Sequence, residues 1–310
     1  MHTAFISHPD CLLHDMGLHH PESPARLKAI EDELAGSGLM DKLEHHLAPL
    51  ATLGQLKRVH APEYIALLDA AGRQALSAGL VNLDPDTAMN RYSLQSAYRA
   101  VGAVILATDL VAGKQVENAF CSIRPPGHHA ERNRAMGFCL FNNIAAGVAH
   151  AIEAHALERV AVVDFDVHHG NGTENIFRDD PRVMMVSTFQ HPLYPYSGVK
   201  GRSERMVNIP LRAGSDGEPF REAVSQFWLP ALERFQPQML FISAGFDAHK
   251  DDDLASLNLV EADYTWVTQK IREVAQKYAG NRIVSALEGG YALPALGRSV
   301  AAHLKALNDP

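Results

Sequence analysis

The sequence has few cysteines, no excess of basic residues and no long hydrophobic run, and each feature excludes a class of protein. Its three cysteines form no C-x-x-C pair, which argues against a disulfide framework or a thiolate zinc site and favours a reducing, cytoplasmic setting. A formal net charge of −8 does not suit direct binding of nucleic acid. No run of about 18 apolar residues could span a membrane, and the start lacks the pattern of a signal peptide.

The remaining composition is that of a globular protein. Of 310 residues, 46% are hydrophobic and 21% are charged, which is enough to build a substantial core. Nearly continuous apolar runs alternate with helical stretches, as in parallel strands covered on both faces. We therefore expect one α/β domain over residues 1–310, with a mostly parallel sheet and helices on both faces. The predicted strands are 3–7, 119–123, 160–164, 183–188, 239–243 and 283–287.

Helix signals fill the intervals between these strands. Ser23 reads as an N-cap, with Pro24 at the first helical position and Gly36 as the stop. A helix that begins near Pro219 should kink or break at Pro230, since proline lacks the N–H that a helix interior uses. Further helices are predicted over 98–110, 142–156 and 261–279.

Polar segments follow four of the predicted strands directly. They are RPPGHHA at 124–130, DFDVHHGNGT at 164–173, AGFDAH at 244–249 and EGGY at 288–291. Open α/β sheets bind ligands at the carboxyl ends of their strands. Four strand ends should therefore bring histidine, aspartate and tyrosine to one rim of the sheet.

Asp166, His168 and Asp247 are the candidate metal ligands. Asp166 and His168 lie two residues apart in an extended segment, so their side chains point to the same side, with Cα atoms about 6–7 Å apart. Asp247 supplies a third ligand, and the open fourth position is typical of a catalytic site. Two carboxylates and an imidazole suit zinc, while ferrous iron, cobalt or manganese would also bind. Any one of these residues alone would be read as a cap or a core residue; their joint placement favours a metal. His169 should point away and be structural.

The histidine pair of the Pro-Pro-Gly-His-His turn is the candidate acid–base group. One imidazole, His128 or His129, can serve as general base and then protonate a leaving amine, while the other stays charged. Asp164 and Asn171 are the candidate orienting partners. An aspartate partner raises an imidazole pKa and an asparagine leaves it nearer neutral, which would separate the two roles. The other histidine pairs, 19–20 and 45–46, are interpreted as structural.

Tyr291 follows two glycines, so its loop can adopt unusual backbone angles. Its hydroxyl, aimed at the metal, could donate to the oxyanion of a tetrahedral intermediate, an effect worth about 3 kcal/mol.

Together these motifs resemble the histone deacetylase superfamily and look more like its class II and bacterial deacetylase-like amidohydrolases than class I. The resemblance spans nearly the whole chain and implies the arginase–deacetylase fold, a three-layer αβα arrangement with a mostly parallel sheet of about eight strands. Besides the segments above, it rests on HPESPARL (20–27), VHAPEYI (59–65) and GFCLFNN (137–143).

The resemblance also implies an activity and a set of roles. Zinc, one ion per chain, would bind Asp166, His168 and Asp247, and Tyr291 would polarise an acetyl carbonyl. The general base would be His129, partnered by Asn171. His128, partnered by Asp164, would be its electrostatic companion. A potassium ion is implied near the zinc, at oxygens of Asp164, Asp166, His168, Ser187 and Thr188.

A narrow channel for an acyl-lysine stem is implied as well. Gly137, Phe138 and Tyr194 would line it, with tyrosine at a position where the family often has phenylalanine. Asp86 would be the rim carboxylate that gathers substrate amides. Leu254 stands where polyamine deacetylases carry an acidic gatekeeper, which favours acetyl-lysine over a small acetylated amine, although Asp251–Asp253 could still attract a cationic amine.

Three alternatives stay open at this point. The first is a hydrolase of acetylpolyamines or of other small amides or esters. The second is an arginase-like dimanganese ureohydrolase, which needs more bridging carboxylates than segment 164–173 offers and would hold two metals per chain. The third is a non-catalytic acetyl-lysine binder, which would have no use for Tyr291 and the histidine pair. The sequence does not indicate an oligomeric state.

Overall fold

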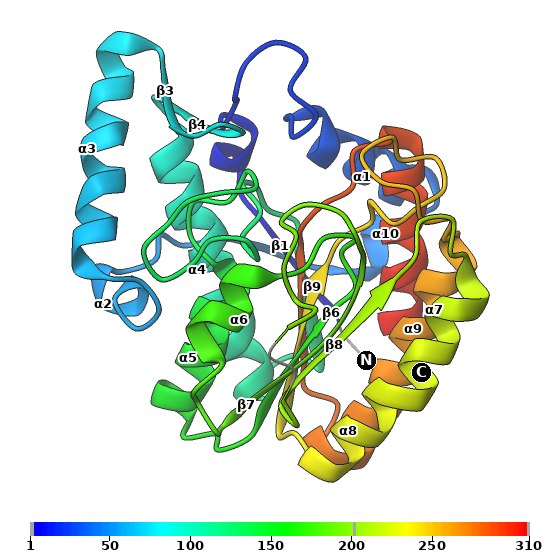
Figure 1. The fold of residues 1–310 in the computed structure, drawn as a ribbon. Helices are drawn as coiled ribbons and strands as arrows, with labels where there is room; N and C mark the ends of the chain where they lie inside the picture. The colour runs from blue at the N-terminus through cyan, green and yellow to red at the C-terminus, as the bar shows by residue number, and fades with distance from the viewer. Residues whose placement is uncertain (1–2, 201–202, 309–310) are drawn as a thin grey trace.

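The centre of the computed structural model, which describes residues 3–200 and 203–308, is an eight-stranded sheet (Figure 1). Its strands pair in the order β2-β1-β5-β10-β9-β6-β7-β8, and every neighbouring pair is parallel. The strands are β1 (Thr3–Ser7), β2 (Glu44–Leu47), β5 (Asn118–Cys121), β6 (Val160–Asp164), β7 (Val183–Gln190), β8 (Met206–Leu211), β9 (Met239–Ala244) and β10 (Ile283–Leu287).

Helices cover both faces of this sheet, which confirms the predicted three-layer architecture. Figure 1 shows α4 and α5 on one face and α1 with α7 to α10 on the other. No helix within the described residues is long and apolar enough to cross a membrane. The α-helices are α1 (Ala25–Gly36), α2 (Leu53–Leu56), α3 (Pro62–Ala78), α4 (Ser93–Ala112), α5 (Asn143–His155), α6 (Asn171–Phe177), α7 (Gly217–Ala223), α8 (Leu229–Phe235), α9 (Glu261–Val274) and α10 (Leu293–Asn308).

The predicted strands match the sheet's interior and miss its edges. β1, β6 and β10 have the predicted bounds, and β5, β7 and β9 differ from the prediction by one or two residues at their ends. β2 and β8 were not predicted, and they are the two outermost strands. Edge strands are covered on fewer sides and need no continuous apolar run, as the largely exposed sequence of β2 illustrates.

Local chemistry explains where the helices begin and bend. The Asn142 side chain accepts a hydrogen bond from the Ala145 N–H at 2.9 Å and starts α5. The predicted start of α1 is wrong by one residue, because Pro24 is the cap and α1 begins at Ala25. Pro230 does not break its helix. Instead the preceding turn, η3 (Val224–Trp228), widens into a π-turn that accommodates the missing N–H.

Smaller elements complete the chain. An antiparallel hairpin of β3 (Leu80–Asp84) and β4 (Thr87–Asn90) lies outside the main sheet and carries Asp86 in its turn. Two short 3₁₀ segments, η1 (Pro9–Leu12) and η2 (Met40–Lys42), and a second π-turn, η4 (Ala275–Ala279), make up the rest.

Candidate active site

The four central strands of the sheet, β5, β10, β9 and β6, are neighbours in that order, and they are the strands that the four polar segments follow. All four are fully buried along their length. Because the strands are parallel, their carboxyl ends meet at one edge. The predicted rim therefore forms at the middle of the sheet.

Asp166, His168 and Asp247 come together at this rim. The Nδ1 atom of His168 lies 3.1 Å from Asp166 Oδ1 and 3.2 Å from Asp247 Oδ2. One ligand atom from each residue lies within 4.8 Å of the others. Both carboxylates are buried, and the imidazole is nearly so. These three residues, called the rim trio below, have the geometry of a candidate metal site.

Backbone N–H groups hold the two carboxylates of the rim trio and leave one oxygen free. The Gly289 N–H donates to Asp166 Oδ2 at 2.8 Å, and the Val167 N–H donates to Asp247 Oδ1 at 2.9 Å. Asp247 Oδ2 is buried, and no residue in 3–200 or 203–308 donates a hydrogen bond of good geometry to it. A Cβ at Gly245 or Gly289 would collide with the carboxylates. This oxygen, 3.2 Å from His168 Nδ1, is suited to a cation, because a buried anion needs a positive partner.

The charged groups of the rim trio strongly shift one another's pKa values. Burial alone would lower the pKa of His168, but hydrogen bonds to Asp166 and Asp247 outweigh burial and raise this pKa to about 10. Burial, reinforced by the charge of Asp166, raises the pKa of Asp247 to about 6. The imidazole therefore holds a proton between two carboxylates, which is the position that a metal cation would take.

The histidine pair lies next to the rim trio, with its two rings tilted by 46° to each other. The ring centres of His128 and His129 are 4.1 Å apart. His128 Nδ1 is 3.0 Å from Asp164 Oδ2, and His129 Nδ1 is 2.7 Å from Asn171 Oδ1. Each imidazole thus contacts the partner expected from the sequence through Nδ1. The Nε2 atom of each ring is not used in these contacts.

The two partners give the two imidazoles opposite pKa shifts. Burial would lower the pKa of His128, but the charges of Asp166 and Asp164 outweigh burial and hold this pKa well above its usual value. Burial lowers the pKa of His129 well below its usual value, and the charges of His128 and His168 act in the same direction. At neutral pH the pair therefore combines one cationic and one neutral ring, in the sense expected from the aspartate and asparagine partners.

Tyr291 is held at the rim through its backbone. The N–H groups of Tyr291 and Ala292 both donate to Asp252 Oδ2, at 2.6 and 3.1 Å. The Arg26 guanidinium lies 4.9 Å from the centre of the Tyr291 ring. Burial raises the pKa of Tyr291 well above its usual value, more than Arg26 lowers it. The hydroxyl therefore stays protonated and is available as a donor.

Two of the predicted channel residues place aromatic rings against the site. The Phe138 ring lies edge-on to the Tyr291 ring, with centres 5.9 Å apart. The Tyr194 ring lies edge-on to His129 at 5.3 Å and to His168 at 6.2 Å. Phe138 and Tyr194 therefore both pack against catalytic candidates, and a channel between them stays a prediction.

Asp86 fastens the loop that carries Phe138. Gly137 and Phe138 have φ angles of 56° and 67°, a left-handed conformation that costs energy at Phe138. The Gly137 N–H donates to Asp86 Oδ1 at 3.1 Å, and the Phe138 N–H donates to Thr87 Oγ1 at 2.9 Å. These bonds hold the strained turn in place. A contact between Asp86 and substrate amides stays a prediction.

The acidic run after Asp247 does not face a substrate as a unit. Asp252 is 5% exposed, and its two oxygens accept from the Tyr291 loop and from the Leu254 N–H at 3.1 Å. Asp251 lies 3.3 Å from the Arg298 guanidinium. The expectation that this run attracts a cationic amine is therefore wrong for Asp252, which is buried and engaged. Leu254 is 37% exposed.

Of the residues expected around a potassium ion, Asp164 ends β6 and Ser187 and Thr188 lie on the adjacent strand β7, while Asp166 and His168 follow β6. Asp164 pairs with Ser187 in register, and the N–H of Asp166 donates to Asp164 Oδ1 at 3.1 Å. Ser187 and Thr188 are buried. Ser187 Oγ has no hydrogen-bond partner among the residues that the structure describes, so a buried oxygen is free at the expected position.

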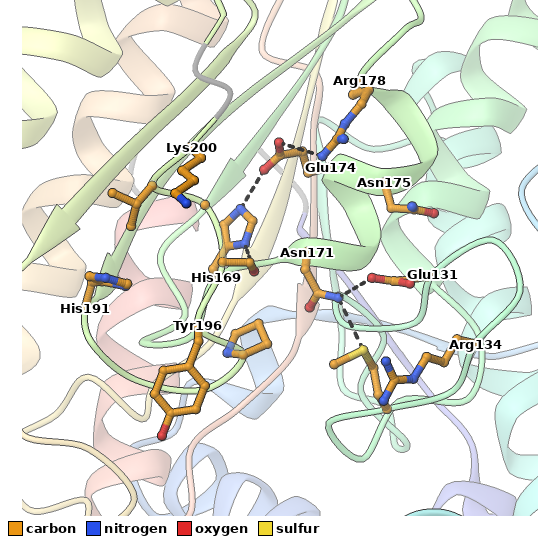
Figure 2. A pocket seen from close by; sticks show the side chains of 15 residues that line it. Glu131, Arg134, His169, Asn171, Glu174, Asn175, Arg178, His191, Tyr196 and Lys200 are labelled. Carbon is orange, nitrogen blue, oxygen red and sulfur yellow. Dashed lines mark hydrogen bonds and ion pairs between the residues drawn. The ribbon is translucent and has the colours of Figure 1, made fainter.

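Two further histidines, His169 and His20, were interpreted as structural from the sequence, and their contacts in the structure differ. His169 points away from the rim trio: its Nδ1 lies 2.8 Å from Ser197 Oγ and its Nε2 lies 2.8 Å from Glu174 (Figure 2). Its structural role is confirmed by these contacts. His20 accepts from a backbone N–H, but its ring also lies edge-on to Phe138 with centres 4.7 Å apart, so it supports a residue of the site.

Glu288 is a residue of the site that sequence reasoning missed. Its Oε2 accepts from the N–H groups of Gly127 and His128 at 2.7 and 3.0 Å, and its Oε1 accepts from Ser243 Oγ. Burial raises the pKa of Glu288 to about 7. It stands in the EGGY segment, where only the tyrosine had been assigned a role. No local spacing reveals a contact across 160 positions of chain.

Comparison with known proteins agrees with this fold. The histone deacetylase domain model matches residues 20–307. The chain is 36% identical to the histone deacetylase-like amidohydrolase of Pseudomonas aeruginosa, over 99% of this chain and 88% of that protein. It is 35% identical to the probable deacetylase of Archaeoglobus fulgidus, over 94% and 82%. The crystal structure of the HDA15 HD domain superposes with a TM-score of 0.91 at 31% identity, covering 99% of this chain and 90% of that one.

The fold and the site, taken with these comparisons, define a hydrolytic enzyme built at the strand ends of a parallel α/β sheet. The chain belongs to the histone deacetylase family, and it is a hydrolytic deacetylase.

Proposed function

We propose that this enzyme is a zinc-dependent deacetylase that hydrolyses N-acetyl amides, with acetyl-lysine in proteins or peptides as its substrate, to give acetate and a free amine. One observation carries the proposal: a buried, metal-compatible trio lies against two imidazoles whose pKa values are shifted in opposite directions. Hydrolysis needs both a neutral base and a positive charge near the developing oxyanion.

The rim trio fits a zinc ion. Two carboxylates and one imidazole match its preferred ligands, and three protein ligands leave a position open. The buried Asp247 Oδ2 accepts no well-aligned hydrogen bond from the described residues and lies 3.2 Å from His168 Nδ1, so an acidic oxygen and an imidazole nitrogen face each other as two ligands of one cation would. When bound, zinc supplies Lewis acidity, polarising a carbonyl and making a nearby water more acidic.

Side chains of the protein carry out the rest of the hydrolysis, each in a different role. His129, neutral at physiological pH, takes the proton of the attacking water at Nε2 and later returns it to the leaving amine. His128, held cationic by Asp164, stabilises the developing negative charge. The protonated Tyr291 hydroxyl donates to the same oxyanion. Asn171 orients His129 through the hydrogen bond to Nδ1.

Substrate preference is proposed from the residues around the site. Phe138 and Tyr194 offer aromatic faces to the apolar stem of an acetylated lysine. Leu254 carries no charge to select a polyamine, and neighbouring Asp252 is committed to the Tyr291 loop. These features support acetyl-lysine over small acetylated amines.

A potassium ion beside β6 and β7 is proposed as a structural companion of the zinc. The free, buried Ser187 Oγ and the adjacent Asp164 and Thr188 supply oxygen ligands of the kind that hard cations prefer.

The proposal is tested by comparing an acetyl-lysine peptide with N-acetylputrescine as substrates of the purified protein, before and after chelation and after zinc is returned. We expect acetate from the peptide, slower release from N-acetylputrescine, loss of activity on chelation and recovery with zinc. Faster cleavage of N-acetylputrescine would overturn the substrate assignment. Activity that withstands chelation would overturn zinc dependence, and two metals per chain with urea formed from arginine would replace the proposal by a ureohydrolase.

A further inference from the structure

Glu131 lies two positions after His129, and its side chain reaches the far side of Asn171. Asn171 Nδ2 donates to Glu131 Oε1 at 2.9 Å and contacts the Met136 sulfur at 3.4 Å, while Asn171 Oδ1 faces His129 Nδ1 at 2.7 Å. A continuous chain of hydrogen bonds therefore runs from the His129 imidazole through the Asn171 amide to the Glu131 carboxylate. Figure 2 shows Asn171 with its dashed contacts to Glu131 and to the sulfur.

This chain of hydrogen bonds allows only one placement of the protons on the Asn171 amide and the His129 ring. An ionised carboxylate accepts hydrogen bonds and cannot donate them, so the NH₂ group of Asn171 must face Glu131. The amide oxygen then faces His129, and Nδ1 of that ring must carry the proton. Nε2 is left as the unprotonated nitrogen. Without Glu131 the Asn171 amide could turn over, present NH₂ to His129 and favour the opposite tautomer, in which Nε2 is protonated and cannot act as a base.

We propose that Glu131 is a positioning residue of the reaction: it fixes the orientation of Asn171 and thereby the tautomer in which His129 acts. The proposal rests on the proposed function insofar as His129 is the general base, but the tautomer itself can be measured without catalysis.

The surroundings of Glu131 exclude two simpler explanations of its presence. Within residues 3–200 and 203–308 its carboxylate makes no ion pair with lysine, arginine or histidine, and nearby Arg134 is paired with Asp84 at 2.8 Å. Its main chain is held separately, because the Glu131 N–H donates to the Arg134 carbonyl and its own carbonyl accepts from His60 Nδ1. The side chain is therefore not needed as a salt bridge or to hold the loop.

Solvent can reach the Glu131–Asn171 pair. Both residues line a pocket of about 690 Å³, together with Arg134, Glu174, Arg178 and Lys200, and His129 is not among the residues that line it (Figure 2). If the Glu131 carboxylate is removed, water from this pocket replaces it. Water both donates and accepts, so it satisfies the amide in either orientation and no longer selects one.

The first experiment reads the tautomer directly. Zinc-loaded protein with ¹⁵N-labelled histidine is studied by long-range ¹⁵N–¹H correlation, and the His129 signals are assigned by their absence in His129→Gln. We expect a protonated Nδ1 and a bare Nε2 in the unmodified protein, and shifts averaged between two tautomers in Glu131→Ala. A single Nδ1-protonated tautomer in Glu131→Ala would overturn the proposal, whatever the enzyme's activity proves to be.

The second experiment is a double-substitution cycle. Asn171→Asp places a carboxylate oxygen where Nδ2 now lies 2.9 Å from Glu131, so like charges oppose each other and kcat should fall by roughly 100-fold. Glu131→Gln alone keeps an acceptor and should cost about threefold. When the two substitutions are combined, the amide introduced at position 131 can donate to the carboxylate introduced at position 171. We therefore expect at least about a tenfold recovery over Asn171→Asp alone. Simple addition of the two losses would contradict the proposal.

Steady-state kinetics complete the test. Glu131→Ala should lower kcat about tenfold and leave KM within about twofold, because the side chain acts on the base and not on bound substrate. Arg132→Gln is the matched control on the same loop: its side chain is exposed and it should leave both constants unchanged. Equal losses in Glu131→Ala and Arg132→Gln would mean that the loop as a whole, and not the carboxylate, is responsible.

Discussion

Within residues 3–200 and 203–308, two clusters contain aspartate and histidine at metal-binding distances, but they differ in burial and charge. One is the rim trio of Asp166, His168 and Asp247. The other, called the surface trio here, consists of Asp109 on α4 with His150 and His155 on α5. Asp109 lies 2.8 Å from His150 Nε2 and 2.7 Å from His155 Nε2. By distance alone the two clusters look equivalent.

The surface trio is already neutralised by its neighbours. The Asp109 side chain is 48% exposed, and Arg58 donates to His150 Nδ1 at 2.8 Å. A guanidinium only donates, so the neutral His150 ring carries its proton on Nε2 and gives it to Asp109. One solvated carboxylate, two imidazoles and a guanidinium have no need of a further positive charge.

The rim trio has the opposite balance. Two carboxylates, each about 1% exposed or less, meet a single imidazole, and Asp247 Oδ2 accepts no well-aligned hydrogen bond from the described residues although His168 Nδ1 lies 3.2 Å away. Protons on His168 and on His128, whose Nε2 lies 3.7 Å from Asp166 Oδ1, face the three carboxylates of Asp164, Asp166 and Asp247, so one negative charge stays uncompensated. The comparison teaches that net charge and burial, more than residue type and distance, decide which cluster needs a cation.

The strongest way to break this comparison is to remove one imidazole from each trio. His168→Ala should lose the metal and reduce kcat at least about 10³-fold, because the Lewis acidity of the ion is worth several kcal/mol. His155→Ala is the matched control and should keep both the metal and the activity. Metal analysis and initial rates check both variants, and metal loss in His155→Ala would contradict the distinction between the trios.

A second substitution separates chemistry from metal binding at the rim. His129→Ala removes the proposed base and should lower kcat by about 10²- to 10⁴-fold, while the metal content stays near that of the unmodified protein. Near-normal turnover would contradict the assigned role. Loss of metal would show that the histidine pair belongs to the ion's ligand set.

Tyr291→Phe is expected to have a smaller effect. It removes one donor to the oxyanion, which typically costs about 3 kcal/mol or roughly 10²-fold in kcat, with metal binding and KM little changed. Measuring both kcat and KM for Tyr291→Phe and for the unmodified protein tests this expectation. A change confined to KM would assign Tyr291 to substrate binding instead.

The smallest expected effect is the release of the His168 proton when zinc binds to the rim trio. Because the hydrogen-bonded carboxylates raise the pKa of His168 to about 10, this imidazole is protonated at pH 7 before metal enters. Zinc binding should therefore release about one proton per ion and weaken as pH falls. Calorimetric titration in two buffers of different ionisation enthalpy measures that number. A value near zero would mean that zinc does not displace the His168 proton.

The sequence predicted the strands at the sheet's centre to within two residues at their ends, and the segments of the rim, because both depend on local pattern. Continuous apolar runs mark doubly covered strands, and polar segments directly after them mark the rim. The edge strand β2, with sequence EHHL, has no such run and was missed. Asp252 was read as part of an exposed acidic run, whereas it is buried and holds the Tyr291 loop.

The supporting residues share one reason for escaping prediction. Glu288, Asp252 and Glu131 act through hydrogen bonds to atoms that only the folded chain brings near. Spacing in a single sequence carries no information about such partners. The functional roles of the rim residues stay predictions as well, since geometry places them together without showing turnover.

Zinc-edge anomalous scattering from crystals of the zinc-loaded protein is the most direct measurement of the central claim. The account predicts one strong peak among Asp166, His168 and Asp247 and none beside Asp109. No peak at the rim, or a peak of equal height at the surface trio, would contradict it.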